Sequence, residues 1–414
     1  MRYKTALRAY TAKRIEEIES ADILVGIPCY NNQDTIAHVI QMVTHGLAAH
    51  YKDMRSVIMV ADGGSTDDTR ETAKEFEIKP WQEKIVSMYR GPGGKGSAFR
   101  SIFEAARRLS VQACMVVDSD LRSITSDWVK HLLEPVMERG YQYVSPVYSR
   151  YKYDGTITNN IVYNLTRALY GLRIRQPIGG DFAFAGELAA HYTEQDVWET
   201  DVARYGIDIW MTTHAITNRF KICQSNLGVK IHDAKDPAES LGPMFRQVVY
   251  TLFSMMEQNE TAWKDVKGSV SVPIFGMKDL MEPVPISVNR ERLVEEYKAG
   301  FAQFQGLYED IYCLECFAEL KRCAGMPEDK FRMPVETWAR VLYETAATFH
   351  HWEHNRHQLI GLVVPLYLGR IASFINHTRD MTTDEAEDVV ERQAEVFEQF
   401  KPYLLEVWNK KPGP

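Results

Sequence analysis

Short apolar segments alternate with amphipathic ones between residues 22 and 150. Four segments rich in β-branched residues predict strands: 22–30 (DILVGIPCY), 56–64, 84–90 and 113–120. Between the first two strands, apolar residues recur at helical spacing and predict a helix: Ile36, Val39, Ile40, Val43 and Leu47. Ser65 and Asp68 have the spacing of a capping box, and residues 97–109 predict a further helix. This alternation predicts a parallel sheet with helices on both faces.

The pattern changes after about residue 260. Residues 289–323, 334–354 and 382–408 are amphipathic and predict helices. We therefore predict an α/β domain over residues 1–260 and a mainly helical C-terminal region over residues 261–414. Within the first domain we expect two halves, one over about residues 22–125 and the other over about residues 126–260.

Charge and composition exclude some classes of protein. The formal net charge of −8 argues against nucleic-acid binding, which needs a basic surface. The longest apolar run, Leu359–Gly369, is too short to cross a bilayer and is closed by Arg370, so no membrane partner is expected. The first 20 residues are polar and lack the apolar stretch of a secretory signal. These features favour a cytoplasmic protein.

The cysteines give a weak signal. There are six in 414 residues, and only Cys313 and Cys316 form a CxxC pair, in a segment with a helical pattern. Zinc and redox sites usually need a second pair, so we favour inert helical cysteines, with a zinc or redox site as the alternative.

Polar residues and glycines stand where the predicted strands end. Asn31, Asp62, Gly93–Gly96 and Asp118–Asp120 each follow one of the four strands. Ligands of open parallel sheets bind at the carboxyl ends of the strands. These four groups are therefore the first candidates for a binding site.

The sequence VVDSD places two carboxylates after the fourth strand. Asp118 and Asp120 are two residues apart, so on an extended chain they point to the same side. Such a pair is suited to Mg²⁺ or Mn²⁺, which often share their ligands with substrate phosphates. The alternative is a helix-capping aspartate beside a surface aspartate.

The loop GPGGKG is a candidate for phosphate binding. Gly93, Gly94 and Gly96 allow close approach of the backbone to an anion, and a helix N-terminus follows. Lys95 adds a charge suited to a diphosphate. The loop is neither a Walker nor a Rossmann motif, and the alternative is a simple turn.

These segments together carry a resemblance. VGIPCYNNQDTI, VADGGSTDDT, GGKGSAF and VVDSDL resemble, in order and spacing, the nucleotide-sugar half of GT-A glycosyltransferases. PIGGDFAF (177–184), RYGIDIWMTTHAI (204–216) and NLGVKIHDAKDP (226–237) are similar to the retaining family of glucosyl-3-phosphoglycerate, mannosyl-3-phosphoglycerate and glucosylglycerate synthases. The resemblance covers about residues 22–260. It implies a Rossmann-like GT-A fold and a divalent metal, Mg²⁺ or Mn²⁺.

The resemblance implies a role for particular residues. The donor pocket is expected to include Pro28, Tyr30, Asn31, Asp62, Gly94, Lys95, Ser119, Gly179 and Gly180. The metal ligands are expected to be Asp118, Asp120 and His232; taken alone, a histidine on a strand is more often structural. The catalytic residues are expected to be Lys95, Asp181, as the partner of the hexose hydroxyls, and Asp208, where the family usually has glutamate. For either aspartate the alternative is a helix cap or a solvated loop residue.

The acceptor segment departs from the family pattern. Relatives that use phosphoglycerate tend to have an arginine about twenty residues before the GG-acid turn, and this chain has Thr156 there. The resemblance assigns acceptor binding to Thr156, Thr158 and Asn159. We therefore expect an acceptor without a phosphate, such as D-glycerate, unless another cation replaces the clamp: Arg150, Lys152, Arg173 or Arg175.

A histidine-rich segment remains outside the resemblance. His350, His354 and His357 have the spacing of one helical face, but the HExxH pattern of a zinc protease is absent. We favour a solvated or core-edge helix, with a helix that reaches back to the acceptor pocket as the alternative.

The expected activity is retaining hexose transfer from a nucleoside diphosphate sugar to the 2-hydroxyl of D-glycerate or 3-phosphoglycerate. The partners are then a UDP- or GDP-hexose and a small hydroxy acid, with glucose or mannose as the sugar and a homodimer as the expected assembly. Alternatives are a GT-A transferase with another small-molecule or glycoside acceptor, and a non-catalytic protein that binds sugar nucleotides. The chain lacks the motifs expected of an inverting transferase and those expected of a nucleotidyltransferase.

Overall fold

The computed structural model describes residues 3–232, 237–276 and 283–410. The chain divides into two compact units, each formed by several segments. The sheet unit comprises Met1–Ser149, Arg175–Asp233 and Val272–Pro283. The helical unit comprises Arg150–Ile174, Ala234–Ser271 and Val284–Pro414.

An eight-stranded sheet, in the order β10-β8-β5-β7-β4-β1-β2-β3, forms the centre of the sheet unit. All neighbouring strands are parallel except β7, which is antiparallel to β4 and β5. The strands are β1 (Ile23–Cys29), β2 (Ser56–Asp62), β3 (Glu83–Met88), β4 (Ala113–Val116), β5 (Tyr143–Ser149), β7 (Phe182–Ala185), β8 (Ile222–Val229) and β10 (Ile274–Phe275). The helices are α1 (Ala9–Ile18), α2 (Ile36–His50), α3 (Thr69–Glu75), α4 (Lys95–Arg108), α5 (Ser126–Met137), α7 (Gly186–Thr193), the 3-10 helix η2 (Asp201–Ala203) and α8 (Ile207–Thr217).

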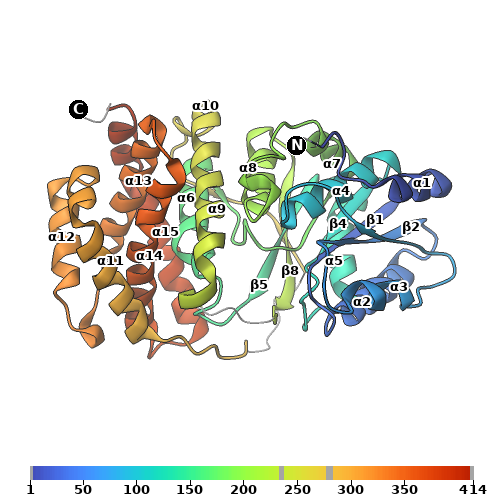
Figure 1. The fold of residues 1–414 in the computed structure, drawn as a ribbon, viewed down its shortest axis with the longest axis horizontal. Helices are drawn as coiled ribbons and strands as arrows, with labels where there is room; N and C mark the ends of the chain where they lie inside the picture. The colour runs from blue at the N-terminus through green and yellow to red at the C-terminus, as the bar shows by residue number, and fades with distance from the viewer. Residues whose placement is uncertain (1–2, 233–236, 277–282, 411–414) are drawn as a thin grey trace. The chain divides into compact units, whose positions relative to one another are not determined.

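Helices cover both faces of this sheet. In Figure 1, α2 and α3 lie on one side of the strands and α4 and α7 on the other. Every residue of β1 and β2 is buried, as expected for strands covered on both faces. Ile23, Val25 and Ile27 of β1 share one hydrophobic cluster with residues of α2 and α5. The predicted α/β class with a helical C-terminal region is confirmed.

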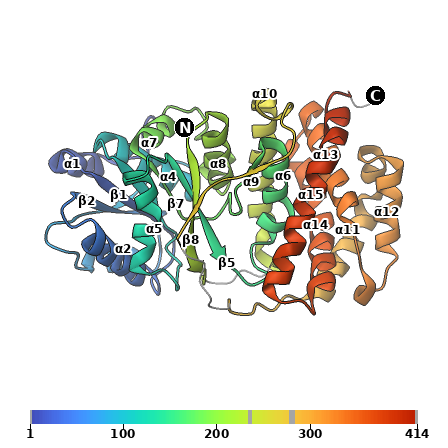
Figure 2. The ribbon, with the colours of Figure 1, turned by 180° about the vertical axis from the view of Figure 1, so that it is seen from behind.

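The helical unit is formed almost entirely by helices, which run side by side in Figure 2. A two-stranded pairing of β6 (Leu172–Arg173) with β9 (Val270–Ser271) accompanies them. The helices are the π-helix η1 (Thr158–Val162), α6 (Tyr163–Tyr170), α9 (Pro237–Gln258), α10 (Glu260–Trp263), α11 (Arg290–Ile311), α12 (Leu314–Ala324), the 3-10 helix η3 (Glu328–Lys330), α13 (Val335–His351), α14 (Arg356–Thr378) and α15 (Thr383–Trp408). Residues 150–174 and 237–271 therefore pack with the C-terminal helices. The domain boundary near residue 260 stays a prediction. The packing divides the chain into the two units given above, each formed by several segments.

One of the predicted C-terminal helices is interrupted. The segment 289–323 forms α11 and α12, and the backbone is extended at Tyr312 between them. Cys313 then precedes α12, and all six cysteines are free, so no disulfide joins the CxxC pair.

The shared helical face predicted for the three histidines is wrong. His350 belongs to α13, His354 lies in the connection, and His357 belongs to α14. The ring of His350 stacks on Trp408 at 4.4 Å, and His357 stacks on Tyr250 at 4.3 Å. Both rings thus pack against aromatic neighbours within the helical unit, as expected for core-edge positions.

Helix α14 is longer than the apolar run predicted. It continues through Arg370 to Thr378, and by length and mean hydropathy (1.6) it is the one helix among the described residues that could cross a membrane. However, 72% of its apolar window is buried within the protein, as in a core helix. Arg370 is also buried; its guanidinium donates to the Met333 carbonyl at 2.9 Å and to Gln393, and burial lowers its pKa to about 10.

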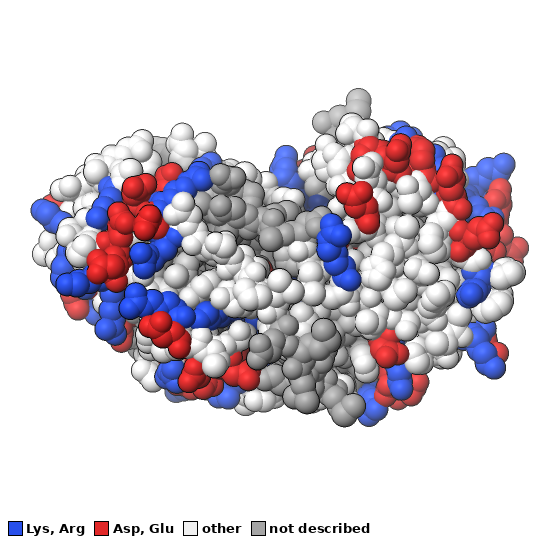
Figure 3. Space-filling model, turned by 90° about the horizontal axis from the view of Figure 1, so that it is seen from below, with Lys and Arg blue, Asp and Glu red and all other residues white. Residues whose placement is uncertain are grey.

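Charged side chains are mixed on the molecular surface. Figure 3 shows Lys and Arg interspersed with Asp and Glu, without a continuous field of one sign on the face drawn. This distribution agrees with a modest net charge of −8.

A buried histidine makes the sheet unit sensitive to acid. His214 of α8 is only 8% exposed and packs against the rings of Trp210 and Tyr192. Burial, assisted by His191, lowers the pKa of His214 to about 4. Between pH 6.5 and 4 the unfolded chain therefore binds a proton that the folded chain does not, so stability falls as the pH falls through this window.

We expect this site alone to cost about 3 kcal/mol of unfolding free energy between pH 7 and pH 4, from a shift of about 2.5 pKa units. His214→Phe should remove that part of the pH dependence, and His45→Gln, an exposed histidine of α2, should not. Urea unfolding followed by tryptophan fluorescence at several pH values measures the difference. Equal slopes for wild type and His214→Phe would contradict the assignment.

Candidate active site

The carboxyl ends of β1, β2 and β4 meet at one edge of the sheet. Cys29 of β1 pairs with Asp62 of β2, and Gly26 of β1 pairs with Val116 of β4. The loops after β1 and β2 are joined, since the Asn31 amide donates to Ser65 Oγ at 2.9 Å and the Thr66 amide donates to Asn31 Oδ1 at 2.9 Å. The strand-end groups predicted from the sequence are thus gathered in one region.

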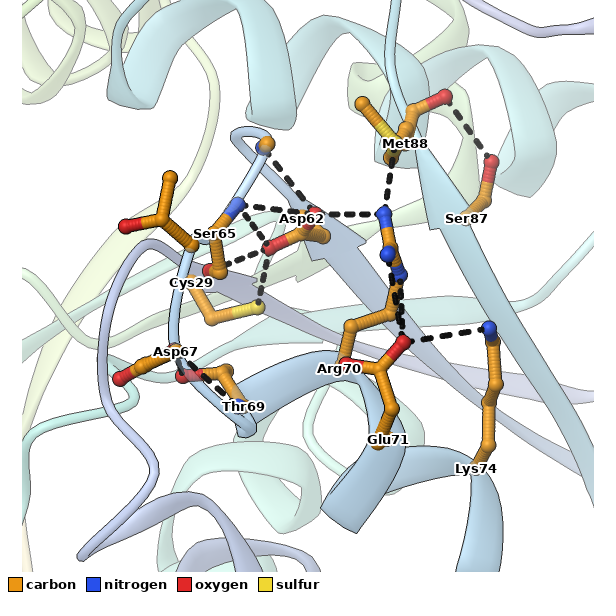
Figure 4. Close-up of polar contacts among 12 residues, drawn as sticks. Cys29, Asp62, Ser65, Asp67, Thr69, Arg70, Glu71, Lys74, Ser87 and Met88 are labelled. Atoms are coloured by element: carbon orange, nitrogen blue, oxygen red, sulfur yellow. Dashed lines mark hydrogen bonds and ion pairs between the residues drawn. The ribbon is translucent and has the colours of Figure 1, made fainter.

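Asp62 organises the loop after β2 (Figure 4). Its side chain is buried and accepts hydrogen bonds from the amides of Gly64 (3.0 Å) and Ser65 (3.1 Å) and from the Ser65 hydroxyl (2.5 Å). Cys29 donates its thiol to Asp62 at 3.7 Å, and burial together with this carboxylate raises the pKa of the thiol. The buried carboxylate of Asp62 therefore fixes the conformation of the loop after β2. Its predicted contact with the nucleotide stays a prediction.

The predicted capping box is wrong. The hydroxyl of Ser65 bonds to Asp62, and α3 begins only at Thr69, after Asp68. The acidic side chain that the loop offers to this helix start is Asp67, which accepts from the Thr69 amide at 3.1 Å and from the Thr69 hydroxyl. Because the Ser65 hydroxyl donates to the buried carboxylate of Asp62, it does not cap the helix.

Exposed Tyr30 and buried Pro28 complete the end of β1. Tyr30 is 60% exposed, which makes its ring available to a ligand, whereas Pro28 lies within the fully buried strand. A base can stack on an exposed aromatic ring, so Tyr30 fits its predicted place in a nucleotide pocket better than Pro28 does.

The glycine loop packs against the segment before α8. The amide of Gly96 donates to the Arg204 carbonyl at 3.1 Å, and the amide of Gly94 donates to the Tyr89 hydroxyl at 3.0 Å. A Cβ at Gly96 would lie 1.8 Å from the Val202 carbonyl oxygen, whereas a Cβ at Gly93 would meet nothing within 4 Å. At least part of the glycine requirement therefore comes from the fold, and Gly93 is the open position.

Lys95, the first residue of α4, joins two carboxylates from different elements. Its Nζ lies 2.8 Å from Asp118 Oδ1 after β4 and 3.2 Å from Asp208 Oδ2 on α8. Although burial opposes the charge, the two carboxylates raise the pKa of Lys95 above its usual value. Burial raises the pKa of Asp208, and Lys95 only partly offsets that effect. The structure thus brings together Lys95, Asp118 and Asp208, three residues predicted from separate motifs.

Lys230, which the sequence analysis missed, holds the other side of Asp118. Its Nζ lies 3.0 Å from Asp118 Oδ2 and 2.7 Å from Asp181 Oδ2. Burial opposes ionisation of Asp118, but Lys95 and Lys230 hold the pKa of this carboxyl well below its usual range. A lysine two residues before His232, at the end of an apolar strand, was the signal in the sequence.

Asp181 faces the interior. Its side chain has no exposed surface; Oδ1 accepts from the Asp118 amide at 2.8 Å, and Oδ2 accepts from Lys230 and from the Tyr148 hydroxyl. The predicted contact between Asp181 and hexose hydroxyls stays a prediction, because the carboxylate is engaged with protein groups in this structure.

Two further residues that were missed connect the loop after β1 to the DSD segment. Ser119 donates its hydroxyl to Asn32 Oδ1 at 2.7 Å, and Thr35 donates its hydroxyl to the Ser119 carbonyl at 2.7 Å. Ser119 is itself buried. Asn32 and Thr35 thereby fix the turn between Asp118 and Asp120.

The chemistry of the predicted metal ligands fits a divalent ion. An isolated β-bridge pairs Leu121 with His232, so the imidazole comes from a segment next to Asp120. Carboxylates suit both Mg²⁺ and Mn²⁺, and one imidazole is an acceptable further ligand for Mn²⁺. Within residues 3–232, 237–276 and 283–410, however, no group of three His, Cys, Asp or Glu residues stands ready to bind an ion. Of the block 226–237 quoted above, residues 233–236 lie outside the described residues.

In this structure Asp118 has partners that compete with a metal ion. Both of its oxygens are paired with ammonium groups, those of Lys95 and Lys230. An ion would have to replace one of these partners. The ligand set Asp118, Asp120 and His232 therefore stays a prediction, with this exchange as its condition.

The predicted acceptor residues belong to the helical unit, where all three are buried. The Thr156 hydroxyl is 2.7 Å from the Tyr367 hydroxyl, and Asn159 donates to the Asp154 carbonyl at 3.0 Å. Thr158 begins the π-helix η1, a distortion often found at functional sites.

Three of the four cations proposed to replace an arginine clamp, Lys152, Arg150 and Arg173, have side chains engaged in other contacts. Lys152 donates to the carbonyls of Thr378 (2.7 Å), Arg379 (2.9 Å) and Met381 (2.6 Å), at the end of α14. The remaining three have these contacts: Arg150 with Asp154 at 3.5 Å, Arg173 with Ser269 at 3.0 Å, and the Arg175 amide with Gln224 at 2.6 Å. Lys152 thus stabilises a helix end.

Comparison with known proteins finds a family match for part of the chain. Residues 24–185, from β1 through β7, match the family model Glycosyl transferase family 2. No curated protein matches the chain. The chain therefore carries a glycosyltransferase domain, which confirms the predicted enzyme class and the predicted nucleotide-sugar fold.

Solved structures of glucosyl-3-phosphoglycerate synthase from Mycobacterium tuberculosis are similar to this chain. A complex with Mg²⁺ and UDP is 28% identical, with 58% of this chain and 83% of that chain covered and a TM-score of 0.46. A complex with Mn²⁺, UDP and glucosyl-3-phosphoglycerate is 26% identical, with 62% and 86% covered and a TM-score of 0.44. A complex with Mn²⁺, UDP-glucose and phosphoglyceric acid is 27% identical, with 58% and 83% covered and a TM-score of 0.45.

Proposed function

We propose that this glycosyltransferase moves a hexose, glucose or mannose, from a nucleoside diphosphate sugar to the 2-hydroxyl of D-glycerate or 3-phosphoglycerate, with retention at the anomeric carbon. D-glycerate is the preferred acceptor in this proposal. The donor is a UDP- or GDP-hexose, and the cofactor is Mg²⁺ or Mn²⁺. A homodimer and a cytoplasmic location remain predictions.

One observation supports the proposal most strongly. Lys95 Nζ of the glycine loop lies 2.8 Å from Asp118 of the DSD segment, after β4, and 3.2 Å from Asp208 of α8. A cation beside a carboxylate that can bind a metal is what a leaving diphosphate requires. The sequence motifs that resemble sugar-nucleotide transferases are the source of these same residues.

The residues have separable roles in this proposal. A divalent ion held by Asp118, Asp120 and His232 would neutralise charge on the leaving diphosphate. Lys95 donates to the diphosphate, Tyr30 stacks on the base, and Asp208 orients the acceptor or stabilises positive charge that develops on the sugar. Gly179, Gly180 and Gly94 provide backbone close to the donor.

The acceptor preference rests on the helical unit. Thr156 stands where phosphate-using relatives have arginine, and its hydroxyl is bound to Tyr367. Lys152 is committed to three carbonyl groups, so it does not offer a free ammonium to a phosphate. A bidentate arginine is the usual clamp for phosphate, and its absence at residue 156 favours an acceptor that has none.

A product assay tests the proposal. UDP-glucose, GDP-glucose and GDP-mannose are each supplied with D-glycerate or 3-phosphoglycerate, with Mn²⁺, Mg²⁺ or EDTA. We expect transfer that EDTA abolishes and a kcat/KM for D-glycerate at least about 10-fold above that for 3-phosphoglycerate. The phosphate would give up hydrogen bonds to water that no charged group of the protein replaces, a loss of about 1.5–3 kcal/mol. NMR coupling at the anomeric position reports retention.

Each outcome has a distinct meaning. Turnover of the phosphorylated acid alone would overturn the acceptor preference but keep the transfer reaction. Metal-dependent hydrolysis of the donor without transfer would keep the donor site and reject both acids. Absence of donor binding would reject the proposal as a whole.

A further inference from the structure

Lys230 is among the most enclosed charged groups of the sheet unit. Its side chain is 3% exposed, and its Nζ contacts Asp118 Oδ2 at 3.0 Å, Asp181 Oδ2 at 2.7 Å and the Gly179 carbonyl at 2.9 Å. The ammonium also lies 4.9 Å from the centre of the Tyr148 ring. Three charged or polar oxygens therefore surround it within the protein.

Lys95 is bound less tightly to the same carboxylate network. Its side chain is 15% exposed, and only its contact with Asp118 Oδ1, at 2.8 Å, is short. The contacts with Asp208 and with the Gly180 carbonyl measure 3.2 Å and 3.4 Å. Of the two lysines on Asp118, Lys95 is the one that can move to a ligand.

The partner of Lys230 is fixed from several directions. Asp181 accepts from the Asp118 amide and the Tyr148 hydroxyl as well as from Lys230, so its orientation is determined by three donors. Gly180 has a φ of +92°, and a Cβ there would lie 2.2 Å from Asp118 Oδ2. The glycine thus leaves the space in which Asp118 and Lys230 meet.

We infer that Lys230 is a positioning residue for the metal site: together with buried Asp181, it holds Asp118 Oδ2 so that Oδ1 faces Lys95 and the incoming metal and diphosphate. The inference rests on the proposed function, in which Asp118 is a metal ligand. Lys95 exchanges Asp118 for the donor when the donor binds, and Lys230 stays in place. Residues that orient metal ligands typically contribute about 10- to 100-fold to metal affinity.

The test measures metal binding directly. Isothermal titration calorimetry gives the Mn²⁺ affinity of the wild type and of the variants Lys230→Met and Lys230→Arg. The control is Lys221→Met, at an exposed lysine just before β8, the strand that Lys230 follows. The titration is done with UDP or GDP, whichever the wild type binds, and nucleotide affinity is also measured in EDTA. We expect Lys230→Met to weaken Mn²⁺ binding about 10- to 100-fold, Lys230→Arg to recover part of it, and Lys221→Met to behave as wild type. Nucleotide affinity in EDTA should change by less than about twofold, because Lys230 lies against protein groups.

A second variant keeps the test valid if Lys230→Met does not fold. Lys230→Met combined with Asp181→Asn removes both buried charges, which avoids an uncompensated carboxylate. The double variant should fold, as circular dichroism can show, and should still bind Mn²⁺ weakly.

Three results would separate the possible failures. Wild-type Mn²⁺ affinity in a folded Lys230 variant would overturn the inference and leave the proposed function intact. A large loss of nucleotide affinity in EDTA would show that Lys230 contacts the diphosphate itself, which also overturns it. No metal or nucleotide binding by the wild type would instead reject the proposed function.

Discussion

Replacing Lys95 with methionine is expected to lower kcat about 10²- to 10³-fold, the usual cost of removing one preorganised group that stabilises developing charge. Methionine keeps the length and apolar body of the side chain but removes the ammonium. Asp118 keeps its second partner, Lys230, so the carboxylate should stay in place. Asp208 loses the cation that lies 3.2 Å away, whereas burial and the charge of Asp118, which raise its pKa, stay in place.

The measurement is steady-state transfer with saturating donor, acceptor and Mn²⁺, together with nucleotide affinity by calorimetry. Lys95→Arg should recover part of the rate, because it restores the charge in another shape. Lys13→Met, on the surface of α1, serves as the control, since that side chain is 79% exposed. An unchanged kcat in a folded Lys95→Met protein would remove Lys95 from the reaction.

The residues at the carboxyl edge of the sheet could be predicted from the sequence, because the strands and the polar groups at their ends are both local features of the chain. Buried parallel strands appear as short runs of β-branched residues, and the groups at their ends follow directly in the chain. Asp62, Lys95 and Asp118 could therefore be placed at one edge before the structure was known. Asp208, from a distant helix, was reached only through the resemblance to a family.

The rest depended on contacts between distant segments. Lys230 is 112 residues from Asp118, and its place two residues before His232 is the one local hint that it lies near that carboxylate. Ser65 was misassigned because a buried acceptor, Asp62, competes with the helix start for its hydroxyl. The histidine segment failed because Trp352–Asn355 leaves the helical conformation, although the spacing of the histidines suits one helix face.

Gly93 and Gly96, two glycines of the candidate phosphate-binding loop, should respond differently to alanine. At Gly96 a Cβ would lie 1.8 Å from the Val202 carbonyl oxygen and 2.8 Å from the Ala203 Cα, so α4 would have to move away from η2. We expect Gly96→Ala to lower the free energy of unfolding by about 3 kcal/mol, the upper range for overpacking. Transfer should also fall, because Lys95 is the adjacent residue and its contact with Asp118 would shift.

Gly93→Ala is the matched variant, since a Cβ there meets no atom within 4 Å. Its unfolding free energy should change by less than about 0.5 kcal/mol, as at other open surface positions. If the loop backbone approaches a diphosphate, Gly93→Ala should nevertheless weaken donor binding, because a methyl group would stand where the phosphate comes close. Urea unfolding and nucleotide titration of both variants measure these effects. Stable folding with normal donor affinity in Gly93→Ala would mean that the glycines serve only the packing of α4, and the diphosphate would then depend on Lys95 and the metal alone.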